Sequence, residues 1–192
     1  MSAAPRLILA SASPRRRDLL SEHGYAFEVI PADVEEIAHP HYTPGEIVLE
    51  NAQKKARAVA RADPDARVLG VDTIVAFEGE VFGKPANMEE AFAMLRRLSG
   101  RTHEVYSGVC VVEGSGDREH NFTEITRVHF HQRSDDELRA YLARIGPLDK
   151  AGAYAAQDDR GEMIARFEGS FSNVIGLPME KLNRLLSPES AR

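Results

Sequence analysis

Cysteine, tryptophan and long apolar runs are scarce or missing in this chain of 192 residues. Cys110 is the single cysteine, which excludes an internal disulfide bond and a cysteine-rich zinc site. No apolar run approaches the roughly 20 residues that a membrane-spanning helix needs. The sequence starts without the apolar segment of a secretory signal. We therefore expect a cytoplasmic protein that does not contact membranes.

Basic residues are also in the minority. The 24 Lys and Arg residues face 30 Asp and Glu residues, which gives a formal net charge of -6. A binder of duplex nucleic acid usually carries a basic domain, so we expect no nucleic acid partner. A small phosphate ligand is compatible with this charge, because a few well-placed cations suffice to bind it. The length and the 43% hydrophobic fraction indicate a single globular domain over residues 1–192.

Apolar periodicity, turn residues and helix caps predict a mixed α/β protein. Strands are expected at residues 6–10, 27–30, 67–77, 102–113, 119–131, 163–167 and 173–175. Helices are expected after a cap at Ser13, over 43–62, from Asn87 to before Gly100, over 134–144 and from Pro178 onward. A hairpin turn at Gly114–Asp117 makes part of the sheet antiparallel, while the interleaved helices favour parallel pairs elsewhere.

Standard nucleotide and metal motifs fail in this sequence. Gly79–Pro85 resembles a phosphate-binding P-loop but is one residue short, and it ends in Pro where Ser or Thr should reach magnesium. The pairs His39/His41 and His129/His131 have no third ligand nearby, so we favour polar surface over a metal site.

The segment Ser11–Arg17 follows a predicted strand and opens a predicted helix. Free N–H groups and the helix dipole attract an anion at such a position. Three arginines, Arg15, Arg16 and Arg17, are unfavourable there unless an external anion neutralises them. Guanidinium groups bind phosphate through paired hydrogen bonds. We therefore favour a phosphate site over a capped helix with a solvated basic turn.

Asp72 lies inside the most apolar predicted strand. Burial of a carboxylate is costly unless it is paired or bound to a metal. Asp72 is therefore a candidate general base or metal ligand facing a cleft. A strand-end aspartate satisfied by local N–H groups is an equally good interpretation. Taken with the arginines, Asp72 is compatible with an enzyme acting on phosphate esters, and with no narrower class.

Other polar residues carry a weak signal when each is taken alone. Such lysines and paired glutamates are ordinarily solvated, although loops carry a large share of binding residues. A loop amide could also recognise the edge of a base. The residues in question are Lys55, Lys84, Lys150, Gln157 and the pair Glu35-Glu36.

Motifs along nearly the whole chain resemble the Maf (septum-formation) family of nucleoside triphosphate pyrophosphatases. In order they are LASASPRR at 9–16, KA at 55–56, VDTIV at 71–75, GKP at 83–85, LSGRTH at 98–103, DKAGAY at 149–154 and VIGLP at 174–178. The resemblance implies an elongated mixed α/β fold similar to inosine triphosphate pyrophosphatases. It also implies two lobes around a cleft, and it suggests a homodimer.

The reaction implied by this resemblance converts a nucleoside triphosphate and water to the monophosphate and pyrophosphate, with a divalent cation such as Mg²⁺ or Mn²⁺. Asp72 matches the position of the proton acceptor of the family, and Glu36 together with Asp72 matches its metal-binding positions. Substrate-binding positions are matched by Ser11, Arg15, Arg16, Lys55, Thr73, Lys84, Lys150 and Gln157. Phosphoryl transfer depends mainly on positioning and charge neutralisation, which these residue types supply.

Three positions separate two branches of the family. The dTTP/UTP branch has Arg, Thr and Gln where this chain has Arg15, Thr73 and Gln157. The 7-methyl-GTP branch has Trp at the first position, and an indole can stack on a cationic purine. Because this chain contains no tryptophan, the resemblance favours pyrimidine substrates: dTTP, UTP and, as a further expectation, modified pyrimidine nucleotides. A 7-methyl-GTP pyrophosphatase and a non-catalytic nucleotide-sensing regulator of cell division are the alternatives.

Overall fold

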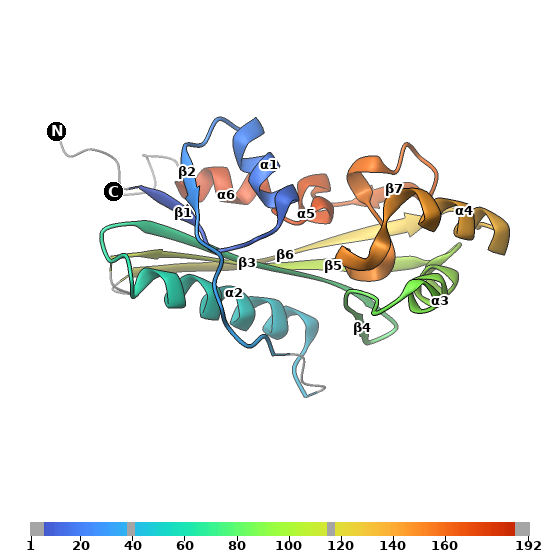
Figure 1. Ribbon diagram of the computed structural model, residues 1–192, viewed down its shortest axis with the longest axis horizontal. Coiled ribbons are helices and arrows are strands. Elements are labelled where there is room, and N and C mark those ends of the chain that lie inside the picture. The colour runs from blue at the N-terminus through green and yellow to red at the C-terminus, as the bar shows by residue number, and fades with distance from the viewer. Residues whose placement is uncertain (1–5, 38–40, 115–117, 187–192) are drawn as a thin grey trace.

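The computed structural model describes residues 6–37, 41–114 and 118–186 (Figure 1). Within these ranges, seven strands form one mixed sheet in the order β2-β1-β3-β5-β6-β7, and β4 pairs with β3 outside this path. The strands are β1 (Leu7–Leu9), β2 (Phe27–Val29), β3 (Arg67–Phe77), β4 (Glu80–Phe82), β5 (Thr102–Glu113), β6 (Arg118–Phe130) and β7 (Ile164–Glu168).

Helices cover both faces of this sheet. Figure 1 shows α2 along one face, with α1, α5 and α6 on the other and α3 and α4 at the far end of the elongated molecule. The helices are α1 (Pro14–Glu22), α2 (Pro44–Ala60), α3 (Met88–Leu98), α4 (Asp135–Ile145), α5 (Phe171–Ile175) and α6 (Met179–Leu186). Three short 3₁₀ turns follow α4, namely η1 (Pro147–Asp149), η2 (Ala151–Ala153) and η3 (Ala156–Asp158). No helix in the described ranges is long and apolar enough to cross a membrane.

The mixed α/β prediction is confirmed, and so are the predicted caps of three helices. Thr43 and Ser134 form capping boxes with Glu46 and Glu137, and the Asn87 side chain accepts from the N–H of Glu90. Parallel pairs join β1 to β2 and β3, while the other pairs are antiparallel. The predicted turn at Gly114–Asp117 falls largely outside the described residues.

Two local predictions are wrong. The segment Asn173–Ile175, expected as a strand, belongs to helix α5, because the Ser170 hydroxyl caps the N–H of Asn173 at 3.0 Å. The Asn173 amide also bonds to the Val105 carbonyl of β5, a contact far along the chain. Ser13 does precede α1, but its side chain makes no capping hydrogen bond.

Two glycines allow α2 to lie directly on the sheet. A Cβ atom at Gly70 of β3 would come within 2.1 Å of the Ala52 carbonyl oxygen. A Cβ atom at Gly108 of β5 would come within 2.3 Å of the Val48 backbone. Gly108 pairs with Asp72 in the sheet, and Gly70 and Asp72 share a face because strand side chains alternate. Helix α2 therefore passes directly over Asp72.

The edge of β3 opposite β5 is open over a short stretch in its middle. Strand β1 pairs only with Arg67–Leu69, and β4 pairs only with Val75–Phe77. Residues 70–74 thus have a strand neighbour only on the β5 side within the described structure. Side chains from both faces of β3 can reach this gap, because no strand separates them there.

Candidate active site

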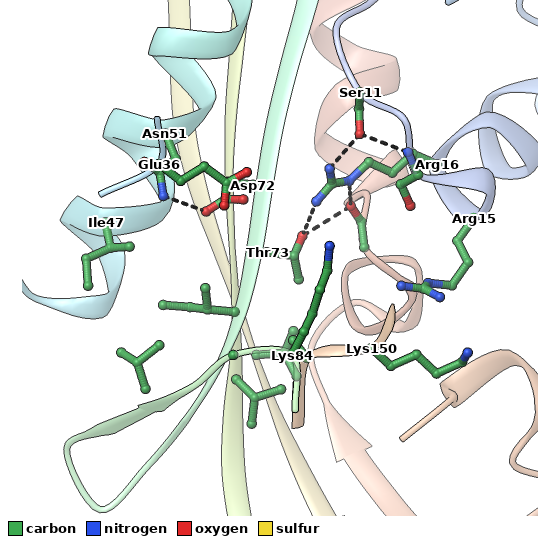
Figure 2. Close-up of a pocket in the computed structure, with 18 of the residues that line it drawn as sticks. Ser11, Arg15, Arg16, Glu36, Ile47, Asn51, Asp72, Thr73, Lys84 and Lys150 are labelled. Atoms are coloured by element: carbon green, nitrogen blue, oxygen red, sulfur yellow. Dashed lines mark hydrogen bonds between the residues drawn. The ribbon is translucent and has the colours of Figure 1, made fainter. Parts of the chain in front are cut away.

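A pocket of about 1030 Å³ opens at the gap along β3. Its size matches the upper end of small-molecule sites, about 300–1,000 Å³. Residues from the two ends of the chain and from its middle line it (Figure 2). Nine of the ten site residues expected from the sequence line this pocket: Ser11, Arg15, Arg16, Glu36, Lys55, Asp72, Thr73, Lys84 and Lys150.

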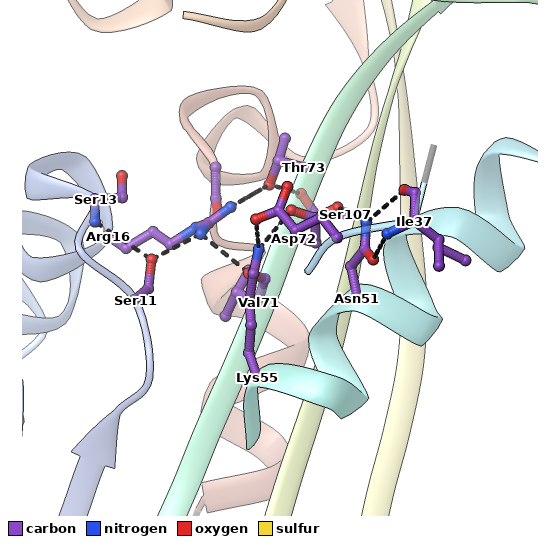
Figure 3. Close-up of polar contacts among 12 residues, drawn as sticks. Ser11, Ser13, Arg16, Ile37, Asn51, Lys55, Val71, Asp72, Thr73 and Ser107 are labelled. Atoms are coloured by element: carbon purple, nitrogen blue, oxygen red, sulfur yellow. Dashed lines mark hydrogen bonds and ion pairs between the residues drawn. The ribbon is translucent and has the colours of Figure 1, made fainter. Parts of the chain in front are cut away.

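Asp72 reaches the pocket from the α2 face of β3 and is 7% exposed. Its Oδ1 atom lies 2.8 Å from Nζ of Lys55, and that ammonium also lies 2.7 Å from Oε1 of Glu36. The Asn51 amide nitrogen donates to Oδ2 of Asp72 at 3.0 Å (Figure 3). The sequence interpretation of a paired, buried carboxylate is therefore correct, whereas satisfaction by local N–H groups is not what the structure shows.

Arg16 occupies the opposite face of β3, and it is only 9% exposed. Its guanidinium donates to the Gly176 carbonyl at 2.9 Å, the Ser11 hydroxyl at 2.8 Å, the Val71 carbonyl at 3.1 Å and the Thr73 hydroxyl at 3.1 Å. Burial lowers the pKa of Arg16 from its ordinary value, while the Asp72 charge opposes that shift. Arginine has five N–H donors, and four are used here, so one remains for a ligand.

The partners of the Ser11 hydroxyl determine which of its hydrogen-bonding groups is free. Its oxygen accepts from Arg16 at 2.8 Å and from the N–H of Ser13 at 3.3 Å. A serine hydroxyl has two acceptor lone pairs and one O–H donor. With both lone pairs used, the O–H is left to donate, and an anionic oxygen in the pocket is its natural partner.

Thr73 acts on the site through other residues. Its hydroxyl bonds to Arg16, to the Ser107 hydroxyl at 2.8 Å and to the Gly176 carbonyl at 3.3 Å. One donor and two acceptors are thereby used, which is the whole capacity of a hydroxyl. Thr73 therefore holds the guanidinium of Arg16 in position, and its hydroxyl has no hydrogen-bonding capacity left for the nucleobase of a ligand.

Three further cations line the pocket, and two of them share one partner. Arg15 pairs with the Asp149 carboxylate at 3.1 Å, and Lys150 pairs with it at 2.5 Å. Burial acts to raise the pKa of Asp149, but the bonds from Lys150 and Arg15 hold it below its ordinary value. Lys84 has no hydrogen-bond or ion-pair partner within the described residues, and Figure 2 shows its side chain pointing into the pocket while Lys150 extends away.

Gln157 is exposed on η3 and does not line the pocket. The structure instead places Tyr154 and Ala156 in the wall there. The Tyr154 hydroxyl bonds to Nε2 of His103 at 3.1 Å, and Phe130 packs edge-on against both rings. Burial lowers the pKa of His103 to about 3, so this histidine is neutral and holds Tyr154 in place.

Two carboxylates of the pocket, Glu36 and Asp72, are of the type that binds divalent cations. Within the described ranges no group of three or more His, Cys, Asp or Glu side chains forms a metal site. Glu36 and Asp72 do contact one common ammonium, Nζ of Lys55, so their oxygens lie close together. Mg²⁺ is usually held by one or two carboxylates plus substrate phosphates, which is the donor set available here.

Sequence comparison relates this chain to proteins of known family. A protein of Bdellovibrio bacteriovorus named dTTP/UTP pyrophosphatase is 44% identical over 188 residues, covering 95% of this chain and 98% of the relative. A protein of Bacillus anthracis with the same name is 44% identical over 181 residues, covering 94% of each. Among solved structures, a HAM1 protein from Coxiella burnetii aligns with 68% of this chain and 75% of its own, at TM-score 0.49 and 19% identity.

The family model described as Maf-like protein matches residues 6–189, nearly the full length. This match covers the strand, helix and loop segments that carry the pocket residues, from Ser11 to Gly176. Together with relatives at 44% identity over almost the whole chain, it establishes that this chain belongs to the Maf family.

Proposed function

We propose that this chain is a nucleoside triphosphate pyrophosphatase that hydrolyses dTTP and UTP to the monophosphate and pyrophosphate. The observation that carries the proposal is the meeting of Asp72 with Arg16, Lys55 and Lys84 in one pocket, across an open strand edge. A base and several cations in one cleft suit phosphoryl transfer, which needs positioning and charge stabilisation. The names of the relatives support this reaction class.

In the proposed mechanism Asp72 is the general base. It takes a proton from a water molecule that attacks the α-phosphorus, and pyrophosphate leaves with the bridging oxygen. Lys55 keeps the Asp72 carboxylate oriented through its contact at 2.8 Å. The free ammonium of Lys84, the remaining N–H of Arg16 and the O–H of Ser11 bind phosphate oxygens and neutralise their charge.

Glu36 and Asp72 are the residues that would hold the divalent cation. When bound, Mg²⁺ or Mn²⁺ would neutralise charge on the phosphate oxygens. Lys55 then contacts the same two carboxylates that bind the cation, and it prevents them from repelling each other before substrate arrives.

The preference for a pyrimidine nucleobase in the substrate is supported by the sequence more than by the pocket geometry. Arg15, Thr73 and Gln157 match the pyrimidine branch, although Thr73 is engaged with Arg16 and Gln157 lies outside the pocket. The relatives at 44% identity carry the name dTTP/UTP pyrophosphatase. A cytoplasmic location, where free nucleotides occur, and a homodimer remain predictions that fractionation and sedimentation would test.

Pyrophosphate release from a panel of nucleoside triphosphates, each with Mg²⁺ or Mn²⁺ and with a chelator, tests the proposal. We expect dTTP and UTP to be the preferred substrates, with no turnover in the chelator. If no triphosphate yields pyrophosphate, the proposal of an enzyme is refuted, and a non-catalytic nucleotide sensor becomes the favoured alternative. Release from 7-methyl-GTP alone would contradict the pyrimidine preference.

A further inference from the structure

Asn51 is a buried polar residue that no motif of the sequence singles out. It lies in α2, one helical turn before Lys55, so both side chains project from the same face of the helix. Only 2% of Asn51 is exposed, yet it lines the pocket. A buried amide is costly unless all of its hydrogen bonds are made, so its partners indicate what it does.

The orientation of this amide follows from Ile37. The N–H of Ile37 can only donate, and it lies 2.7 Å from one side-chain atom of Asn51, which must therefore be Oδ1. The Ile37 carbonyl can only accept, and it lies 3.1 Å from the other atom, Nδ2. A flipped amide would oppose donor to donor and acceptor to acceptor, so Ile37 excludes it.

The second N–H of Asn51 is then directed at Asp72. It donates to Oδ2 at 3.0 Å, while Lys55 donates to Oδ1 at 2.8 Å (Figure 3). Asn51 and Lys55, which lie on one face of α2, therefore each bind one of the two carboxylate oxygens of Asp72. Rotation of the Asp72 carboxylate would break both contacts.

Asn51 also connects the two carboxylates of the site. Ile37 directly follows Glu36, whose Oε1 atom contacts Lys55. By binding both backbone groups of Ile37 and the side chain of Asp72, one amide sets the segment that carries Glu36 relative to strand β3. We propose that Asn51 is a positioning residue for hydrolysis, which orients Asp72 and aligns Glu36 with it.

This inference rests on the proposed pyrophosphatase activity. The main variant is Asn51→Leu, which keeps a side chain of similar size against the sheet and removes all three hydrogen bonds. We expect kcat for UTP to fall about 10²-fold, as for a misplaced catalytic group. KM should change by less than about threefold, because the residue does not bind substrate.

A binding readout separates positioning from folding. A UTP analogue with an imido bridge between the α- and β-phosphates is not cleaved at that bond, and its binding can be followed by titration calorimetry. We expect Asn51→Leu to bind one analogue per chain with nearly wild-type affinity. Asn51→Asp provides a second variant of the same shape: it still accepts from the N–H of Ile37 but offers Asp72 no donor, so kcat should fall here too.

Lys54→Met is the matched control. Lys54 lies on the same helix and its ammonium donates to the Glu35 carbonyl at 3.4 Å, so it also ties α2 to the segment before Ile37. It makes no contact with Asp72 among the described residues, and its loss should leave kcat near the wild-type value.

Three outcomes would overturn the inference. They are a kcat of Asn51→Leu within about twofold of wild type, a parallel loss of analogue binding and kcat, and an equal loss in Lys54→Met. A wild-type protein that releases no pyrophosphate would instead refute the proposed function on which the inference rests.

Discussion

Lys84 and Lys150 are equally good candidates for phosphate binding from the sequence, but their surroundings in the folded chain differ. Lys84 points into the pocket with no partner in the described structure, whereas Lys150 is held by Asp149 and the Gly146 carbonyl. We expect Lys84→Met to raise KM for UTP by at least about tenfold, the loss of one charged phosphate contact. Lys150→Met should raise it far less. Steady-state kinetics of the two variants, assayed in parallel, would measure both increases in KM. A larger increase for Lys150→Met than for Lys84→Met would contradict the prediction.

Asp72 is the residue whose loss should matter most for the chemical step. Asp72→Asn keeps the shape of the side chain but removes the proposed general base, so kcat should fall about 10²–10⁴-fold. Thermal unfolding should show a folded variant, because an amide oxygen can still accept from Asn51 or Lys55. Near-normal pyrophosphate release by Asp72→Asn would remove this residue as the base.

At the scale of elements, the approach of α2 to the sheet depends on Gly70. Gly70→Ala places a methyl group 2.1 Å from the Ala52 carbonyl oxygen, a backbone atom that can move only with the helix. We expect a loss of about 1–3 kcal/mol in urea unfolding. Turnover should fall as well, because α2 carries Lys55 and Asn51.

Gly45 provides the control for that substitution. It lies in the first turn of the same helix, and a Cβ atom there would meet nothing within 4 Å. Gly45→Ala should stabilise the protein by about 0.4–1 kcal/mol, because alanine restricts the unfolded chain. Equal destabilisation by both alanines would show that close packing is not the cause.

A pH-dependent contact joins the outer side of α2 to β6. Arg57 binds Glu119 through two hydrogen bonds of 2.6 and 2.8 Å. The Arg57 bond holds the pKa of Glu119 below its usual 4.5. The pair therefore stabilises the fold above that pH, and its contribution is lost as the pH falls through 4.5 to the lower native value.

Arg57→Met tests this linkage. The variant should unfold at a lower temperature than wild type at pH 7, and the difference should shrink as the pH is lowered below about 4.5. Melting curves at stepped pH measure both proteins under the same conditions. A difference that stays constant down to the acid limit would mean that Glu119 is not the linked group.

Elements set by local signals could be predicted from the sequence. The bounds of β3 and β5 and the three caps at Thr43, Asn87 and Ser134 match because the causes lie within a few residues. The α5 segment was predicted wrongly: its cap at Ser170 is local, but the bond from the Asn173 amide to a carbonyl 68 residues away leaves no mark in the sequence. The same limit hides Asn51, whose partners lie 14 and 21 residues away.

The pocket residues were predictable in a different way. Nine were identified by resemblance, while periodicity and capping alone pointed only to the arginines of α1 and to Asp72. Their convergence depends on the gap between β1 and β4, which is a property of strand pairing. The β4 side of this gap is a local hairpin, but the β1 side depends on pairing of Leu7 with Arg67, about 60 residues along the chain, which leaves no local mark in the sequence.

For the molecule as a whole, the site should couple nucleotide binding to stability. The imido analogue of UTP at about 100 times its Kd should add about 2.7 kcal/mol to the free energy of unfolding. That corresponds to a rise in Tm of about 5–11 °C for a chain of this size. Uridine at the same concentration should have little effect, because it lacks the phosphates that the pocket cations are proposed to bind. Thermal scans with each ligand would measure this, and an equal shift by uridine would contradict it.

The bond from Arg16 to the Gly176 carbonyl spans 160 residues. During synthesis, at about 5–20 residues per second, that partner is made about 8–32 s after Arg16. Until then the buried guanidinium lacks one of its acceptors, and α6 does not yet cover Leu7 and Leu9 of β1. A chain that has not been translated as far as Gly176 therefore cannot complete this wall of the pocket.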